Sequence, residues 1–92
     1  MISAGNYLAE VVDIRKWKNG LENGVSVFFN VDGNIITIAR LNNKMAECLL
    51  NEIKGVDPIE KDVTTVWRYK QHIIGVRYII TVDTIVTAFC EE

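Results

Sequence analysis

The chain has few of the residues from which metal sites and disulfide frameworks are built. It contains one histidine, His72, and two cysteines, Cys48 and Cys90, which are far apart in the sequence. A zinc site needs several cysteine or histidine ligands, and a small secreted domain usually needs several disulfides. We therefore expect no metal and no cofactor, and a reducing compartment.

Long apolar runs and domain linkers are also missing. No run of consecutive apolar residues is longer than four, which argues against a membrane-spanning helix. Residues 1–6 reach polar side chains at once and do not resemble a signal peptide. With one proline, no low-complexity tract and no internal repeat, we predict a single cytoplasmic domain over residues 1–92.

The charge balance is slightly acidic. Ten Lys and Arg residues stand against twelve Asp and Glu residues, which gives a net charge of −2. This argues against a protein whose affinity comes from a broad basic surface. Apolar residues make up 49% of the chain, enough for a packed core and for surface patches that support self-association.

The clearest structural signal lies in residues 24–41. The odd positions from Val25 to Val31 are apolar, and the even positions beside them are polar except for Phe28. This alternation is typical of a half-buried strand. Asp32-Gly33 can supply the positive φ angles of a two-residue turn, and a second β-branched run follows over residues 35–41. We predict an antiparallel hairpin.

A long strand is predicted to precede this hairpin. Residues 7–17 contain two partial alternations of opposite parity, which indicates a bulge or bend near Val11-Val12. Two Asn-Gly pairs then mark residues 18–24 as a loop. The first three strands should therefore form a meander.

One amphipathic helix is predicted next. Asn42 or Asn43 can cap its first turn, and Gly55 stands where a helix commonly ends. The apolar positions repeat at helical spacing over about three turns. These positions are Met45, Cys48, Leu49 and Ile53.

The second half of the chain is predicted to return to strands. After a charged linker over residues 57–62, period-2 alternation predicts strands over residues 63–70 and 76–83, and a last strand over 85–90. Gly75 leaves two alternatives open. It could belong to a hairpin turn over residues 71–75 or kink one long strand.

This order of elements, β-β-β-α-β-β(-β), predicts a mainly β fold with one helix. The sheet would be a small curled antiparallel sheet or an OB-like barrel, and the alternative is an open α+β sheet with the helix on one face. The order, with a long bent first strand and a helix after the third, is similar to that of an OB-fold barrel. The resemblance lies in the order of elements and in no motif.

Two clusters of basic and aromatic residues could form a binding site. One covers residues 15–18, and the other covers residues 67–72 with Arg77 nearby. Cations neutralise phosphates and aromatic rings stack on bases, a combination suited to single-stranded nucleic acid or a nucleotide. An OB-like arrangement would bring the clusters together. The candidate ligand-binding residues are Lys16, Trp17, Lys18, Phe28, Arg68, Lys70, His72 and Arg77.

A purely structural interpretation competes with this one. Trp67 and Tyr69 share the parity of Val63, so they could belong to the core while the residues between them form an ordinary solvated edge. Phe28 could be a stacking platform or an interface anchor, or it could be covered by a curled sheet.

The sequence offers no catalytic motif, so we expect a protein that is not an enzyme; a hydrolase that uses Cys48 or Cys90 is the least favoured alternative. The first hypothesis is a small cytoplasmic binding module for an anionic, base-containing ligand. The alternative is a protein–protein interaction module, an adaptor or inhibitor of the kind phages encode, which covers a partner's surface as a monomer or homodimer.

Overall fold

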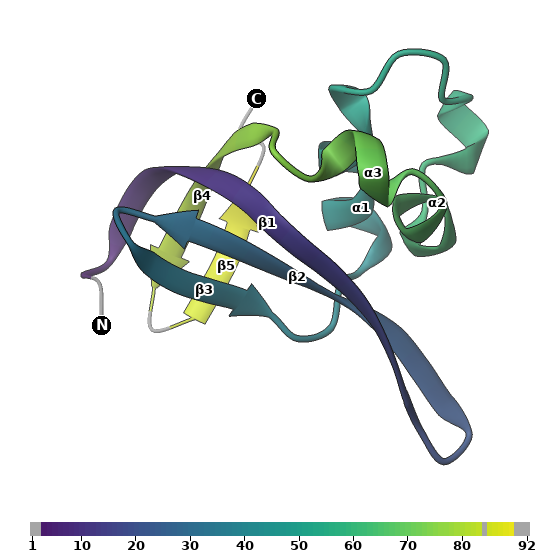
Figure 1. Cartoon of the computed structure of the whole chain (residues 1–92), viewed down its shortest axis with the longest axis horizontal. Coiled ribbons are helices and arrows are strands. Elements are labelled where there is room, and N and C mark those ends of the chain that lie inside the picture. The colour runs from purple at the N-terminus through teal and green to yellow at the C-terminus, as the bar shows by residue number, and fades with distance from the viewer. Residues whose placement is uncertain (1–2, 84, 90–92) are drawn as a thin grey trace.

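Antiparallel strands build most of the molecule. The computed structural model describes the backbone of residues 3–83 and 85–89 and the side chains of residues 3–83. The strands form one sheet in the order β3-β2-β1-β4-β5 (Figure 1). Their bounds are Gly5–Asn19 for β1, Glu22–Val31 for β2, Asn34–Ile38 for β3, Arg77–Asp83 for β4 and Ile85–Phe89 for β5.

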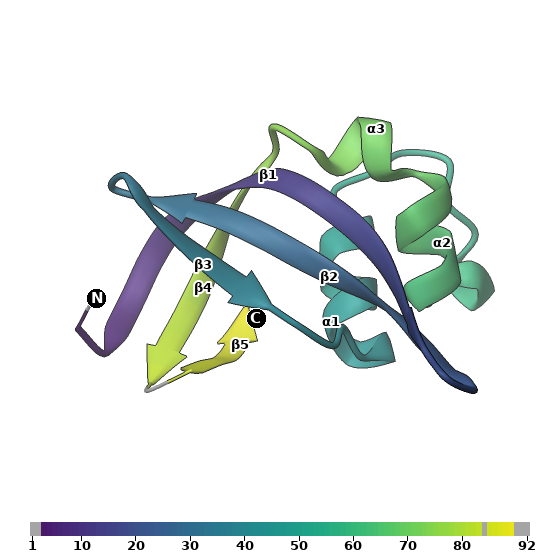
Figure 2. The same cartoon turned by 60° about the horizontal axis from the view of Figure 1, so that its bottom comes forward.

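The sheet curls because β1 belongs to both of its halves. The first part of β1, Gly5–Glu10, pairs with β4, and the rest pairs with β2. The register shifts between Val11 and Asp13, so the predicted bulge is confirmed. The edge strands β3 and β5 approach each other, but no ladder joins them within the described residues (Figure 2). The result is a curled, open antiparallel sheet of the predicted class.

The predicted β2–β3 hairpin is also confirmed. Asp32 and Gly33 both have positive φ, at 50° and 85°, as a type I′ turn requires. The odd-numbered side chains from Val25 to Val31 are buried on the concave face, and Phe28 lies half-buried on the other.

Helix α1, Asn43–Asn51, covers one end of the concave face. The Oδ1 atom of Asn42 accepts a hydrogen bond from the backbone N–H of Met45 at 2.9 Å, which confirms the predicted cap. Ala46, Leu49 and Leu50 are buried, and the other predicted stripe residues, Met45, Cys48 and Ile53, pack half-buried against the core. The helix ends at Asn51, one turn before Gly55.

The strand predicted over residues 63–70 is wrong. The chain passes through a short 3₁₀ helix, Pro58–Glu60, and then forms α2, Val63–Arg68, and α3, Lys70–Ile73. Asp62 caps α2 by accepting a hydrogen bond from the Thr65 N–H at 2.9 Å. Val66 and Ile73 are buried, a spacing of two helical turns. In the described ranges, α2 and α3 are therefore added to the predicted helix α1, and Figure 2 shows these helices gathered at one end of the sheet.

Gly75 belongs neither to a hairpin nor to a kinked strand. It has a φ of +95° and connects α3 to β4. Its N–H donates to the carbonyl of Val11 at 2.8 Å, and the Val11 N–H donates to the carbonyl of Val76 at 3.0 Å. The chain thus rejoins the sheet at the β1 bulge.

The remaining expectations concern the C-terminus and the membrane. The predicted last strand is present as β5, but Cys90 lies outside the described residues. No helix in the described ranges has the length and apolar character needed to cross a membrane.

Candidate functional site

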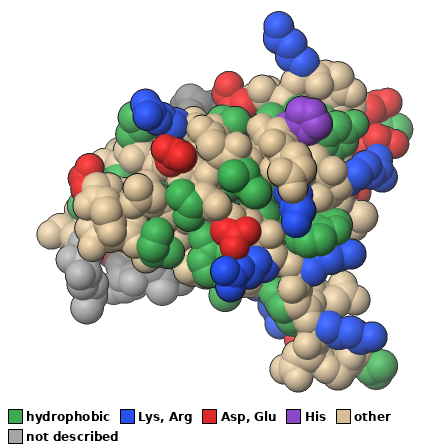
Figure 3. Space-filling model, in the orientation of Figure 1, with side chains coloured by type: hydrophobic (Ala, Val, Ile, Leu, Met, Phe, Trp, Pro, Cys, Tyr) green, Lys and Arg blue, Asp and Glu red, His purple; other side chains and the backbone are tan. Residues whose placement is uncertain are grey.

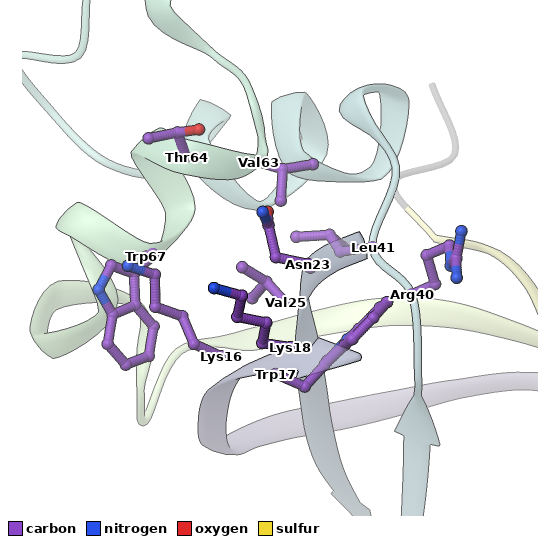
Figure 4. A pocket seen from close by; sticks show the side chains of 11 residues that line it. Lys16, Trp17, Lys18, Asn23, Val25, Arg40, Leu41, Val63, Thr64 and Trp67 are labelled. Atoms are coloured by element: carbon purple, nitrogen blue, oxygen red, sulfur yellow. The ribbon is translucent and has the colours of Figure 1, made fainter. Parts of the chain in front are cut away.

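A groove of about 750 Å³ lies between the β1–β2 hairpin and α2 (Figure 4). We call it the hairpin groove. Its cationic walls are formed by Lys16, Lys18 and Arg40, and its aromatic walls by Trp17 and Trp67. None of the described side chains that line it is acidic.

The β1 strand pairing directs two lysines toward α2. Lys16 and Lys18 lie on the same face of β1 as buried Ile14, because strand side chains alternate. The hairpin extends beyond the body of the sheet (Figure 1). Both lysines there line the groove together with residues of α2. Both residues are exposed, as a charged lining requires.

Trp67 brings the two predicted clusters together. The Lys16 Nζ lies 5.1 Å from the centroid of the Trp67 ring, and the Lys70 Nζ lies 4.2 Å from it. An ammonium group at this distance is attracted by the negative face of an indole. One aromatic side chain on α2 therefore holds a cation from β1 and a cation from α3.

The ammonium groups of Lys16, Lys18 and Lys70 form no ion pair among the described residues, so their charge is available to an anionic ligand. Within the described part of the chain, no carboxylate lies within 4.0 Å of the amine of Lys16, Lys18 or Lys70. Lys70 does interact electrostatically with the carboxylate of Asp13. A hydrogen bond from Arg15, at 2.7 Å, is the main cause that lowers the pKa of Asp13, and the charge of Lys70 lowers it further.

Trp17 is fixed in place by contacts of its own. Its Nε1 donates a hydrogen bond to the carbonyl of Ala39 at 2.9 Å, and its ring lies against the backbone of Gly24 on β2. The guanidinium of Arg40 lies 5.1 Å from the ring centroid and forms an ion pair with Glu22 at 2.8 Å.

Arg40 was missed by the sequence analysis, although a signal existed. The β2–β3 register pairs Val27 with Ile38, and the Leu41 N–H still donates to the carbonyl of Val25 at 3.0 Å. Extending the hairpin register past the end of β3 would therefore have placed Arg40 beside the start of β2.

Five of the predicted ligand-binding residues do not line the hairpin groove, although one of them, Lys70, lies beside it over the Trp67 ring. Phe28 lies on the convex face of β2, where the guanidinium of Arg15 is 5.0 Å from its ring centroid. Arg77 lies on β4 opposite Glu10.

The other two are on the helices. Arg68 approaches Glu60 at 3.9 Å, and exposed His72 makes an edge contact with Tyr69. Trp67 and Tyr69 are half-buried, so they are partly core and partly surface. On the face shown in Figure 3, Lys and Arg side chains gather toward the hairpin and the helices.

Histidine, cysteine and acidic side chains do not line the hairpin groove among the described residues. No group of three histidine, cysteine or acidic side chains there could hold a metal ion. Cys48 is half-buried on α1 and packs against the core, as expected of a small apolar residue. Searches of protein-family models, of curated proteins and of solved structures give no match to this chain.

Proposed function

We propose that this chain is a non-enzymatic cytoplasmic module that binds single-stranded nucleic acid or a nucleotide. One observation carries the proposal. The hairpin groove joins three cationic side chains and two tryptophans with no acidic side chain among its described lining, and Lys70 adds a further cation at Trp67.

The overall charge of −2 does not oppose this proposal, because phosphate binding depends on the local field. Cations that neutralise phosphates release condensed counterions, so affinity falls as the salt concentration rises. The paired carboxylates, Asp13 and Glu22, bond to arginines and leave the groove lysines to the ligand.

The test is a titration of a fluorescein-labelled dT12 strand, followed by fluorescence anisotropy. Binding through three phosphate contacts should weaken roughly 20-fold when salt rises from about 50 to about 200 mM. Unlabelled ATP added as a competitor separates a nucleotide site from a strand site. The absence of salt-sensitive binding to either ligand, at ~100 µM protein and low salt, would overturn the proposal.

A protein–protein interaction module is the second candidate, favoured by the convex face of β1 and β4. Leu8 and Ile79 lie opposite each other there and are 57% and 47% exposed, with Val12 nearby at the bulge. Two such faces could join in a homodimer or cover another protein. Sedimentation over a range of concentrations tests the homodimer, and a strict monomer would exclude it.

A further inference from the structure

We infer that the hairpin groove binds the sugar–phosphate backbone of a single strand and makes little use of the bases. This inference rests on the proposed function and narrows its ligand class. It implies that single strands of DNA and RNA bind alike, whatever their sequence.

The aromatic rings near the groove carry cations where a base would stack. Trp67 has Lys16 and Lys70 over its ring, and Trp17 has Arg40; even Phe28, on the convex face outside the groove, has Arg15. A base that stacked on one of these rings would displace a cation. The site would thereby lose a group that neutralises phosphate, so stacking and phosphate binding compete.

The indole of Trp17 also makes structural contacts that limit its use in ligand binding. Its single hydrogen-bond donor, Nε1, is used by the carbonyl of Ala39. Part of its ring is covered by the backbone of Gly24. Trp17 therefore has no free donor for a base edge. Its ring could offer a face for stacking only if it lost these contacts.

The groove also has few groups that could read base edges. Its uncharged polar side chains are Asn23 and Thr64, one on the hairpin and one on α2. Base-specific recognition depends on paired donors and acceptors held in fixed geometry. Ammonium groups bind phosphate as point charges and carry no such information.

In this arrangement Trp67 is a positioning residue. Its half-buried indole packs against the core, and the ammonium groups of Lys16 and Lys70 both lie over its ring. Both ammonium groups are thereby held at one side chain, although they come from β1 and α3, so a single bound strand can contact both.

The deciding experiment compares dT12 with an abasic strand of twelve tetrahydrofuran phosphates at the same salt concentration. We expect affinities within about threefold, whereas the loss of one stacked base would weaken binding roughly 5- to 150-fold. If dT12 binds and the abasic strand binds roughly fivefold more weakly or worse, the backbone inference is wrong while the proposed function stands. If neither strand binds, the backbone inference is wrong, and the proposed function is then limited to a nucleotide.

A second comparison tests the role of Trp67. Trp67→Leu removes the ring and should weaken dT12 and the abasic strand by the same factor, with a smaller dependence of affinity on salt. Trp67→Phe keeps a ring and should stay closer to the wild type. A Trp67→Leu defect confined to dT12 would instead reveal base stacking. Circular dichroism checks that both variants fold, and the strand comparison on the wild type decides the question if they do not.

Discussion

Trp17 occupies the space that a side chain at Gly24 would need. The two residues are partners across the β1–β2 ladder, and a Cβ on Gly24 would lie 2.5 Å from Cζ2 of the indole. The missing side chain lets the indole approach the backbone while its Nε1 donates to Ala39. This contact links β1 to the segment after β3 and forms one wall of the hairpin groove.

Gly24→Ala should therefore destabilise the protein. Overpacking of a close contact costs about 1–3 kcal/mol, because the indole must move and lose its hydrogen bond to Ala39. Urea denaturation measures the change in the free energy of unfolding. In a Trp17→Leu background the same substitution should cost clearly less, and an equal cost in both backgrounds would show that the two residues are not coupled.

Removal of the two lysines on Trp67 should reduce the salt dependence of strand binding. For Lys16→Gln with Lys70→Gln, we expect the slope of log affinity against log salt to fall by about 0.7 for each lysine. Lys54→Gln is the matched control, since Lys54 is exposed after α1 and does not line the groove. An equal effect of the control would mean that only net charge matters.

Tyr78→Phe should weaken the attachment of α1 to the sheet. The Tyr78 hydroxyl donates a buried hydrogen bond to the carbonyl of Leu49 at 2.7 Å. Its loss should lower the free energy of unfolding by about 1 kcal/mol, measured by urea denaturation. Tyr7→Phe is the matched control because its hydroxyl bonds to the carbonyl of Ser3 in solvent, and it should have a much smaller effect.

Asp62 should make the stability of α2 dependent on pH. The hydrogen bonds from Thr65, chiefly from its backbone N–H, hold the pKa of Asp62 below its ordinary value of 3.8. A lowered pKa in the folded state means that the carboxylate stabilises the fold fully above the unfolded pKa. This stabilisation is lost as the pH falls through the folded pKa.

The measurement is the difference in Tm between the wild type and Asp62→Ala from pH 7 down to pH 2.5. We expect a positive difference that is constant at neutral pH and shrinks below about pH 4. Asp62→Asn keeps an oxygen acceptor for the cap and should lose little stability at any of these pH values. A difference that stayed constant to the lowest pH would contradict the assignment.

The first half of the fold was predictable because local rules agree there with tertiary packing. Alternation fixed the buried face of β2, Asp32-Gly33 fixed the turn, and Asn42 fixed the start of α1. The segment 63–70 resembles a strand in sequence because it opens with four β-branched residues and then alternates aromatic with basic side chains. A capping Asp62 followed by Val66 and Ile73 at helical spacing was the signal that outweighed alternation.

The candidate site was predicted in part. Lys16, Trp17, Lys18 and Lys70 do gather around the hairpin groove, and no sequence pattern could reveal that Trp67 would receive two of the lysines. Phe28, Arg68, His72 and Arg77 carry the same chemistry, but they lie on other faces of the strands and helices. The residue types were enough to identify candidate ligand-binding residues. Only the tertiary structure shows which of these candidates lie at the hairpin groove.

The sequence by itself determined the buried face of β2, the turn between β2 and β3 and the β1 bulge, since these depend on backbone preferences and on the burial of neighbouring apolar side chains. The tertiary structure alone decided that the β1–β2 hairpin would reach past the sheet to α2. That contact joins residues distant in the chain, and its geometry depends on how the helices pack against the concave face, which no local pattern encodes.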